Sequence, residues 1–148
     1  MKRILFLCHG NICRSPMAEF VMKDLAQKAG RAADFEIASA AVSTEELGND
    51  IYPPAKRTLT AHGVPFARRV ARQVTRADYA HFDAIVCMDR SNLRWLSRII
   101  GEDKAGKVSL LMEHAGESRD VADPWYTGDF EATYRDVLRG CKALLEKL

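Results

Sequence analysis

Short runs of consecutive apolar residues divide the chain and predict its strands. The run at 4–8 (ILFLC) shows no alternation of polar and apolar positions, which is typical of a strand covered on both faces, and residues 83–88 (DAIVCM) predict a second strongly buried strand. Residues 35–39 (FEIAS) alternate as a second strand does, and residues 107–111 (KVSLL) are expected to form the last one. The pattern therefore predicts a sheet of about four strands.

The stretches between these runs carry apolar residues at helical spacing. After the first run, apolar residues recur at four-residue steps from Met17, and Gly30 is a suitable end for that helix. Ser15 suits its N-cap and Pro16 its first helical position. Three further helices are expected, of which the last carries one continuous apolar stripe: residues 54–62, 90–99 and 130–148.

Strands that alternate with helices predict an α/β fold, with one doubly wound parallel sheet and helices on both of its faces. No linker, repeat or low-complexity tract interrupts residues 1–148, so we expect a single domain. In such sheets ligands bind beyond the carboxyl ends of the strands, beside a helix N-terminus. Cys8 ends the first predicted strand and is expected at that place.

Composition and charge exclude several classes of protein. Apolar residues make up 47% and charged residues 28% of the 148 residues, as in ordinary globular domains. The net charge of +2, from 22 basic and 20 acidic residues, lacks the basic excess of a nucleic-acid-binding domain. No window approaches the roughly 20 apolar residues of a membrane span, and the first apolar run is shorter than a signal-peptide core. We expect a cytoplasmic protein that binds neither nucleic acid nor membrane.

The cysteines do not indicate disulfides or a metal site. All four are expected to be reduced thiols in the cytoplasm: Cys8, Cys13, Cys87 and Cys141. The chain has no CxxC pair and no HxxxH segment, which are the spacings typical of zinc ligands. The sequence therefore predicts no bound metal.

The CHGNICRS loop has the residue types of an anion-binding site. Gly10 and Asn11 tolerate left-handed backbone angles, which lets successive N–H groups turn inward and form a nest. The following helix adds its positive end, and Arg14 adds a guanidinium that matches two phosphate oxygens. A thiol in such a field favours its ionised form, which the Ser15 hydroxyl can stabilise further. Cys8 is therefore a candidate nucleophile that faces a bound phosphorus.

Cleavage of a phosphate ester also needs an acid that protonates the leaving oxygen. Asp123 in VADPWYTGDF is a candidate, because Pro124 biases it toward an extended conformation and stiffens its loop. Trp125 and Tyr126 come next and can wall a slot for a phenyl ring. The alternative is a surface turn whose aromatic residues pack on the core.

The remaining basic residues are given plainer interpretations. None of the four histidines has a nearby acidic or metal-ligand partner in the sequence, so none is assigned to catalysis. Two groups of arginines are interpreted as solvated faces, with a basic rim that attracts phosphoproteins as the alternative: Arg90, Arg94 and Arg98, and Arg68, Arg69, Arg72 and Arg76.

Three segments in this order, CHGNICRSP, FDAIVCMDRSNLR and DPWYTGDF, resemble the low-molecular-weight protein tyrosine phosphatase family. The resemblance covers essentially the whole chain, including ASAAVSTEELGND and AHGVPFARRVARQVT. It implies a flavodoxin-like sheet, no cofactor, hydrolysis of phosphotyrosine in proteins, and acid phosphatase activity on aryl phosphates. Inorganic phosphate is expected as product and inhibitor, and the chain is expected to be a monomer or a weak homodimer.

The resemblance implies roles for individual residues. Cys8 matches the nucleophile that forms a phosphocysteine intermediate, and Arg14 the residue that binds the phosphoryl oxygens and stabilises the transition state. Asp123 matches the general acid, which then activates water as a base. Trp125 and Tyr126 match the aromatic pair beside the active site.

Further matches lie around the phosphate-binding loop. Asn11 and Ser39 match a hydrogen-bonded pair that holds the unusual backbone of this loop, and Ser15 matches a hydroxyl that stabilises the thiolate. Cys13 matches a second cysteine that, in many members, traps oxidised Cys8 as a reversible disulfide. The implied phosphate-binding residues are His9, Gly10, Asn11, Ile12, Cys13 and Ser15.

The match has departures that bear on the substrate. Glu45 stands where many members carry Trp or Tyr on the other wall of the slot, and Val42 stands where Thr is usual. An acidic wall disfavours binding of an acidic peptide, and it offers less area for stacking on the aromatic ring of the substrate than Trp or Tyr would. His9 varies within the family and is given only a backbone role.

Three alternative functions are weighed against this one. Arsenate reduction needs further redox-active thiols, whereas Cys87 lies in a predicted buried strand and Cys141 on an apolar helix face. Phosphoarginine hydrolysis is associated with Thr at the position of Ile12, and this bulkier apolar residue suits an aromatic ring instead. A non-catalytic phosphate-binding module is disfavoured because the thiol and the acid are both present.

Overall fold

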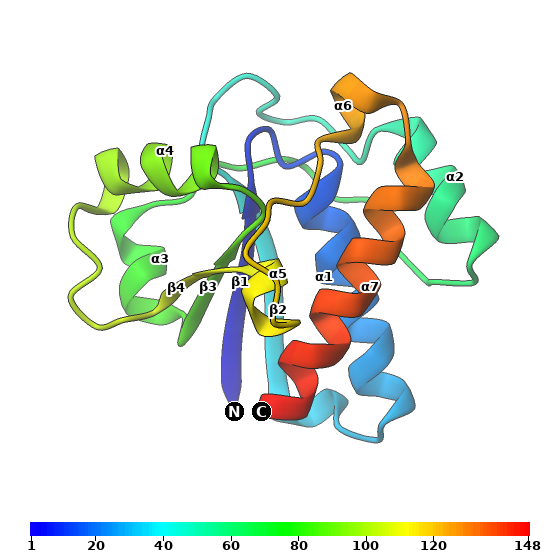
Figure 1. Ribbon diagram of the computed structural model, residues 1–148, viewed down its shortest axis with the longest axis horizontal. Helices are drawn as coiled ribbons and strands as arrows, with labels where there is room; N and C mark the ends of the chain where they lie inside the picture. Colours follow the sequence, from blue (N-terminus) through cyan, green and yellow to red (C-terminus); the bar gives the residue numbers. More distant parts are fainter.

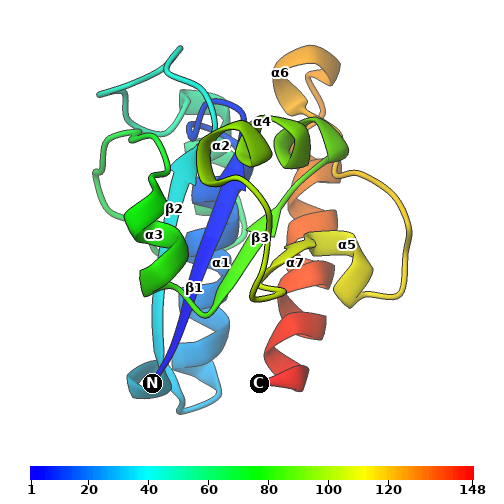
Figure 2. The same cartoon turned by 90° about the vertical axis from the view of Figure 1, so that its left-hand side faces the viewer.

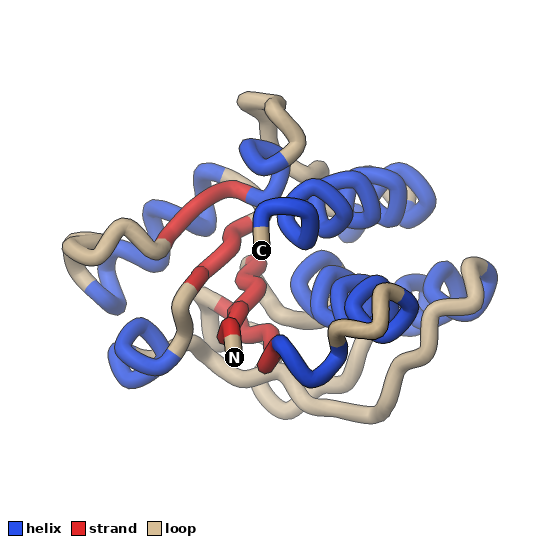
Figure 3. The backbone as a smooth tube through the Cα atoms, turned by 90° about the horizontal axis from the view of Figure 1, so that it is seen from below, coloured by secondary structure: helices blue, strands red, loops and turns tan.

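Four parallel strands form the centre of the structure, a computed structural model that describes residues 1–148. In sheet order they are β2 (Phe35–Ala41), β1 (Lys2–Cys8), β3 (Ala84–Cys87) and β4 (Val108–Leu110). Each neighbouring pair is parallel. Helices pack on both faces of this sheet, as Figures 1 and 3 show. The predicted α/β fold with a four-stranded, doubly wound parallel sheet is confirmed.

The helices form two layers. One face is covered by α1 (Arg14–Lys28) and α7 (Phe130–Lys147), against which α2 (Pro53–Ala61) and the short α5 (Leu111–His114) pack. The other face is covered by α3 (Arg76–His81) and α4 (Arg90–Ile100). Two one-turn elements complete the structure: η1 (Ala32–Asp34) and α6 (Pro124–Thr127). No helix in the structure is both long enough and apolar enough to cross a bilayer.

The absence of polar positions in the first apolar run follows from these two layers. Ile4 and Phe6 of β1 pack in the cluster formed with α1 and α7, whereas Leu5 and Leu7 pack in the cluster formed with α3 and α4. All four side chains are fully buried. Burial of each contributes about 1.5–3 kcal/mol, so the central strand is held from both sides.

The predicted helices are present at residues 54–62, 90–99 and 130–148 with small differences at their ends, but the start of α1 was predicted wrongly. Cys13 is the N-cap residue and no side chain caps this helix. Ser15, the expected N-cap, lies inside the first turn. Its hydroxyl is therefore free to contact Cys8 instead of the helix backbone.

Four short helices were not predicted from the sequence, because they are too short to show a periodicity. The six-residue α3 is an example, although it does carry a local signal. Thr75 Oγ1 accepts the N–H of Asp78, and the Asp78 carboxylate accepts the N–H of Thr75, which is a capping box. The others are η1, α5 and α6.

The carboxyl ends of the central strands meet at one edge of the sheet. Cys8 at the end of β1 is in register with Ala41 of β2, and the preceding residue, Leu7, with Cys87 of β3. Figures 1 and 2 show that α6 and the loop after β1 lie at this same end of the molecule, opposite the two termini. This edge is where the sequence predicts the site.

Candidate active site

The loop of residues 9–13 joins β1 to α1 and wraps around the Cys8 side chain. Cys8 is buried at the end of β1. Asn11 has a φ of 60°, the only positive φ at a residue other than glycine. Asparagine tolerates this left-handed conformation, which directs the Asn11 N–H at the sulfur, with the N and Sγ atoms 3.3 Å apart. The loop thus turns a backbone donor toward Cys8.

A second donor reaches the same sulfur from the first turn of α1. Ser15 Oγ lies 3.0 Å from Cys8 Sγ. It accepts a hydrogen bond from Asn11 Nδ2 at 2.7 Å, and the acceptors within reach of its own hydrogen are the sulfur and, at 3.4 Å, the carbonyl of Ala40. Cys8 Sγ therefore has two hydrogen-bonding partners inside the loop, the Asn11 N–H and the Ser15 hydroxyl.

Asn11 is in turn held by a buried chain of polar side chains. Its Nδ2 also donates to Ser39 Oγ at 3.0 Å, so the predicted contact between Asn11 and Ser39 is present. The Ser39 hydroxyl donates to Glu19 Oε1 at 2.7 Å, and Lys23 Nζ donates to the other Glu19 oxygen at 2.6 Å. Because α1 begins at Arg14, Glu19 accepts this bond from the second turn of the helix.

Arg14, the first residue of α1, is 2% exposed and lies among acceptors. Its Nη1 donates to Asp89 Oδ2 at 2.7 Å and to the carbonyl of Val121 at 2.9 Å. Its Nη2 lies 3.5 Å from Asp123 Oδ2. Burial alone lowers the pKa of Arg14, but the negative charges of Cys8, Asp89 and Asp123 raise it above its ordinary value. The guanidinium is therefore held charged and oriented.

Asp89 was missed as a site residue in the sequence. It follows β3 and is the N-cap of α4, where its Oδ1 accepts the N–H of Asn92 at 2.7 Å. The other carboxylate oxygen is the one that binds Arg14, so one side chain both caps a helix and positions the guanidinium. The available signal was an acidic residue directly after a buried strand, at the edge where ligands bind.

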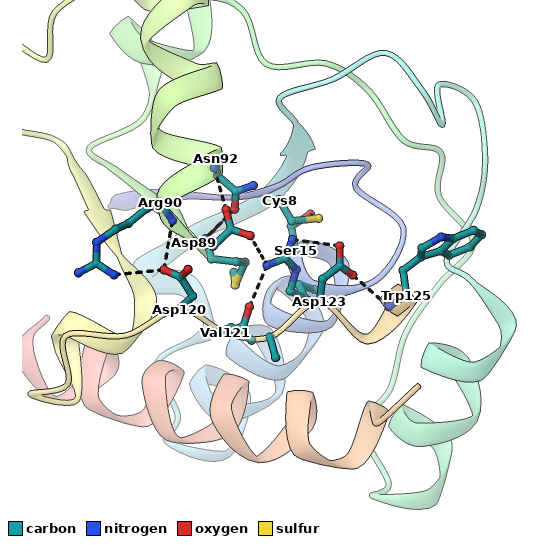
Figure 4. Close-up of polar contacts among 12 residues, drawn as sticks. Cys8, Ser15, Asp89, Arg90, Asn92, Asp120, Val121, Asp123 and Trp125 are labelled. Atoms are coloured by element: carbon teal, nitrogen blue, oxygen red, sulfur yellow. Dashed lines mark hydrogen bonds and ion pairs between the residues drawn. The ribbon is translucent and has the colours of Figure 1, made fainter. Parts of the chain in front are cut away.

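Asp123 approaches the loop from the segment before α7. It is the N-cap of α6, and its Oδ1 accepts the N–H of Trp125 at 3.0 Å. Its Oδ2 faces Arg14, and the side chain is 26% exposed. The bond to Trp125, drawn in Figure 4, fixes the orientation of the carboxylate, while part of the side chain remains open to solvent.

Cys8, Arg14 and Asp123 line one open pocket together with Gly10, Ile12 and Cys13. We call Cys8, Arg14 and the three side chains that hold them the floor network; those three are Asn11, Ser15 and Asp89. We call the outer side chains the pocket rim: His9, Glu45, Glu46, Trp125 and Tyr126. A pocket with a sulfur nucleophile, a guanidinium and a carboxyl group can bind and cleave a phosphate monoester.

Known proteins resemble this chain over its full length. The family model described as low molecular weight phosphotyrosine protein phosphatase matches residues 3–148. The low molecular weight phosphotyrosine protein phosphatase of Rattus norvegicus is 42% identical, over 99% of this chain and 95% of its own. The crystal structure of YfkJ from Bacillus subtilis matches with a TM-score of 0.95 at 36% identity, over 99% and 94% of the two chains. The chain belongs to this family.

One structural match in this phosphatase fold carries a different substrate in its name. The crystal structure of DARP, a Drosophila arginine phosphatase, has a TM-score of 0.89 and 30% identity, and the match covers 99% of this chain and 97% of that one. The fold therefore does not by itself separate phosphotyrosine from phosphoarginine. At the family level the activity of the present chain is that of a phosphotyrosine protein phosphatase.

The pocket rim of this phosphatase has one acidic wall. The expectation that His9 has only a backbone role is wrong, because His9 Nε2 pairs with Glu45 Oε2 at 2.9 Å. The edge of the His9 ring also meets the face of Trp95 in α4, with centroids 5.3 Å apart. Glu46, which sequence reasoning missed, accepts a hydrogen bond from Asn49. Both carboxylates lie on the segment after β2.

The opposite wall of the phosphatase pocket is aromatic. Trp125 packs against Tyr52 with ring centroids 4.9 Å apart, and half of its surface remains exposed. Tyr126 is 84% exposed and makes no side-chain hydrogen bond. The predicted slot-lining pair therefore lies at the pocket, and neither ring is buried in the core.

The four cysteines of the phosphatase differ sharply in environment. Burial, followed by the negative charges of Cys8 and Asp123, raises the pKa of Cys13 to about 12, so this thiol is neutral at pH 7. Cys87 and Cys141 are fully buried, and burial raises the pKa of both. All four are free thiols, and no group of three or more metal-ligand side chains is close enough to hold an ion.

The second group of arginines is a solvated face except at one position: Arg68, Arg72 and Arg76 are exposed, whereas Arg69 is half-buried. Arg72 makes a two-pronged ion pair with Asp78, with both distances near 3 Å. Arg69 turns inward and contacts the backbone and side chain of Asn11. In the first group, Arg90 pairs with Asp120 and Arg98 lies over the Trp95 ring.

Proposed function

We propose that the chain hydrolyses phosphotyrosine in two chemical steps, with Cys8 as nucleophile, Arg14 as phosphoryl-binding residue and Asp123 as general acid and base. The observation that carries this proposal is the convergence of Cys8 Sγ, the Arg14 guanidinium and the Asp123 carboxyl group on one pocket. Two hydrogen-bond donors aimed at the sulfur further support a thiolate that is present before substrate binds.

In the first step the thiolate attacks phosphorus. The S–P bond forms as the P–O bond to the tyrosyl oxygen breaks, and the protonated carboxyl of Asp123 gives its proton to that oxygen. The loop N–H groups and Arg14 carry the charge that develops on the non-bridging oxygens. The products of this step are tyrosine and phosphocysteine at Cys8.

In the second step the same carboxylate acts as a base. Asp123 takes a proton from a water molecule as the water oxygen attacks phosphorus, and the S–P bond breaks. Inorganic phosphate leaves and the Cys8 thiolate is restored. Because phosphate occupies the same nest as the substrate, it acts as a competitive inhibitor.

Two variants test these roles. Cys8→Ser removes the nucleophile and abolishes turnover, while equilibrium binding of inorganic phosphate remains measurable. Asp123→Asn slows phenyl phosphates with poor leaving groups far more than those with activated ones, by about 10²–10⁴-fold at the extreme. Asp120→Asn, on the same exposed segment but outside the pocket, is the matched control. Turnover by Cys8→Ser, or a uniform loss across leaving groups for Asp123→Asn, contradicts the proposal.

The pocket supports an aryl phosphate as substrate. Trp125 and Tyr126 offer faces for a phenyl ring, and Ile12 adds an apolar surface deeper in the pocket. The same features predict acid phosphatase activity on simple aryl phosphates. We expect at least a tenfold preference, in kcat/KM, for phosphotyrosine over phosphoserine peptides.

Phosphoarginine is the second candidate, favoured by the structural match to the Drosophila arginine phosphatase. The guanidino group of phosphoarginine is flat and polar, and a hydroxyl in the phosphate-binding loop can contact it. Ile12 offers no hydroxyl, so phosphotyrosine peptides are expected to react at least tenfold faster. Equal rates on matched phosphotyrosine and phosphoarginine peptides contradict this choice, and Ile12→Thr is the variant expected to raise the phosphoarginine rate.

We further propose that Cys13 protects Cys8 from irreversible oxidation and does not itself act as a nucleophile toward the substrate. Its thiol stays neutral below about pH 12, so iodoacetamide at pH 7 is expected to alkylate Cys8 and spare Cys13, as peptide mass spectrometry checks. Peroxide oxidises the Cys8 thiolate to a sulfenic acid, and attack by Cys13 sulfur then gives a disulfide and water. A Cys13→Ser variant is expected to lose the reactivation by dithiothreitol that the parent shows; equal reactivation contradicts the role.

A further inference from the structure

A guanidinium lies behind the phosphate-binding loop and does not reach the pocket. Arg69 Nη2 donates to the carbonyl oxygen of Asn11 at 2.6 Å and also contacts Asn11 Oδ1. Arg69 lies in the long segment before α3, 58 residues from Asn11 in the sequence. It belongs neither to the pocket lining nor to the floor network.

The Asn11 side chain has every hydrogen-bonding site occupied, and Arg69 decides its orientation. Nδ2 uses both hydrogens on Ser15 and Ser39, whereas Oδ1 accepts from Arg69 and, at 3.4 Å, from the N–H of Arg72. A flipped amide would point its NH₂ group at the guanidinium. Arg69 therefore keeps the amide donor on Ser15, so Asn11 does not take the Ser15 hydrogen, whose nearest acceptor is the Cys8 sulfur at 3.0 Å, ahead of the Ala40 carbonyl at 3.4 Å.

Arg69 also ties this loop to the segment that carries the acidic wall of the pocket. Its Nη1 donates to the carbonyl of Asn49 at 3.3 Å, and its backbone N–H donates to Asp50 Oδ1 at 3.2 Å. The Asn49 side chain binds Glu46 of the pocket rim. One side chain thus connects the phosphate-binding loop, the rim segment and the segment before α3.

The charge of Arg69 also interacts with the charge of Cys8. Burial lowers the pKa of Arg69, while the negative charges of Glu19, Asp50 and Cys8 oppose that change. Arginine stays charged throughout the neutral range, so the partly buried guanidinium is a permanent positive charge on the far side of the loop.

We propose that Arg69 is a positioning residue for the phosphatase reaction: it orients Asn11, and through Asn11 and Ser15 it stabilises the Cys8 thiolate. This inference rests on the proposed function, because it assigns a role within the same chemistry. It predicts that loss of Arg69 changes the ionisation of Cys8 as well as the turnover rate, although Arg69 touches neither substrate nor sulfur.

The test compares Arg69→Ala and Arg69→Lys with Arg68→Ala, since Arg68 is the exposed neighbour and makes no hydrogen bond or ion pair. Arg69→Ala is expected to lower kcat about tenfold, the equivalent of one lost hydrogen bond to a charged group. The pH at which iodoacetamide alkylates Cys8 at half its maximal rate is expected to rise. Arg69→Lys restores the alkylation profile, because it keeps the charge, but only part of kcat, because a single ammonium nitrogen cannot bind the Asn11 oxygens and the Asn49 carbonyl together, as Nη2 and Nη1 of Arg69 do.

A chemical rescue separates positioning from folding. Guanidinium chloride at low millimolar concentration is expected to raise kcat of Arg69→Ala severalfold relative to sodium chloride at equal ionic strength. Arg68→Ala shows neither the loss nor the rescue. Circular dichroism and thermal melting of each variant show whether the fold is intact.

The outcomes distinguish this inference from the proposed function. If the parent protein shows no turnover that depends on Cys8, the proposed function fails. If the parent turns over but Arg69→Ala keeps the parental alkylation profile, Arg69 is not a positioning residue, whatever happens to kcat. The inference is also overturned if Arg68→Ala gives the same shift, or if guanidinium restores no activity to a folded Arg69→Ala.

Discussion

The floor network and the pocket rim line the same pocket but are held in different ways. Asn11, Arg14 and Ser15 are almost wholly buried and each takes part in several hydrogen bonds. Glu45 and Tyr126 are largely exposed, and their side chains have one partner and none, respectively. A change in the floor network leaves buried polar groups without partners, whereas a change in the rim is absorbed by water. Side chains of the floor network are therefore rigidly held, while those of the rim can vary at little cost in stability.

The largest effect is expected for Arg14→Lys, which keeps the charge in the floor network but removes the planar fork. A lysine ammonium cannot bind Asp89, the Val121 carbonyl and two phosphoryl oxygens at once. We expect kcat to fall by about 10²–10³-fold, as for loss of a transition-state donor in a dry site. Steady-state kinetics with p-nitrophenyl phosphate measures the loss, and a decrease below tenfold contradicts the proposed role of the guanidinium.

A smaller loss is expected for Asp89→Asn, which separates the two tasks of this side chain. Asparagine is as good an N-cap as aspartate, so α4 keeps its start and the melting temperature changes little. The charged partner of Arg14 is lost, which is expected to lower kcat by about 10–100-fold. Unchanged kcat in a folded variant would show that Arg14 is oriented by Val121 and Asp123 alone.

At the pocket rim, Trp125→Ala is expected to act on binding rather than on chemistry. Loss of an aromatic contact with the substrate ring is worth about 0.5–1.5 kcal/mol, so KM for phosphotyrosine peptides rises about 2–10-fold with kcat nearly unchanged. Trp95→Ala, an exposed tryptophan that does not line the pocket, is the matched control. A loss in kcat that exceeds the change in KM would place Trp125 with the floor network.

The smallest effect is expected for Glu45→Gln. Glu45 is 64% exposed, and exposed charges interact weakly, so KM for a phosphopeptide with flanking acidic residues is expected to fall about 2–3-fold. The same variant leaves KM for p-nitrophenyl phosphate unchanged, because that substrate has no flanking charge. The difference in KM between the parent and Glu45→Gln on the acidic peptide should vanish at high salt. A difference that persists at high salt would mean that Glu45 acts through its pair with His9 rather than through its charge.

Much of the floor network could be predicted because it is local. Cys8 and Ser15 lie within eight residues, between an apolar run and a helix whose signals are strong. The wrong N-cap assignment shows the limit of local reasoning, because a serine before a proline is a good cap in isolation. In the folded chain the same hydroxyl has a stronger partner in the Cys8 sulfur, and the helix begins without a side-chain cap.

The sequence by itself determined the sheet, the nucleophile loop and the candidate acid, because hydrophobic runs, glycine and proline act over a few residues. Only the tertiary structure decided which distant side chains complete the site: Asp89 is 75 residues from Arg14, and Arg69 is 58 from Asn11. In the sequence both look like ordinary charged residues of a helix start or a solvated segment. They reach the loop because parallel strands bring their carboxyl ends to one edge, and a buried guanidinium or asparagine there needs a partner that water cannot supply.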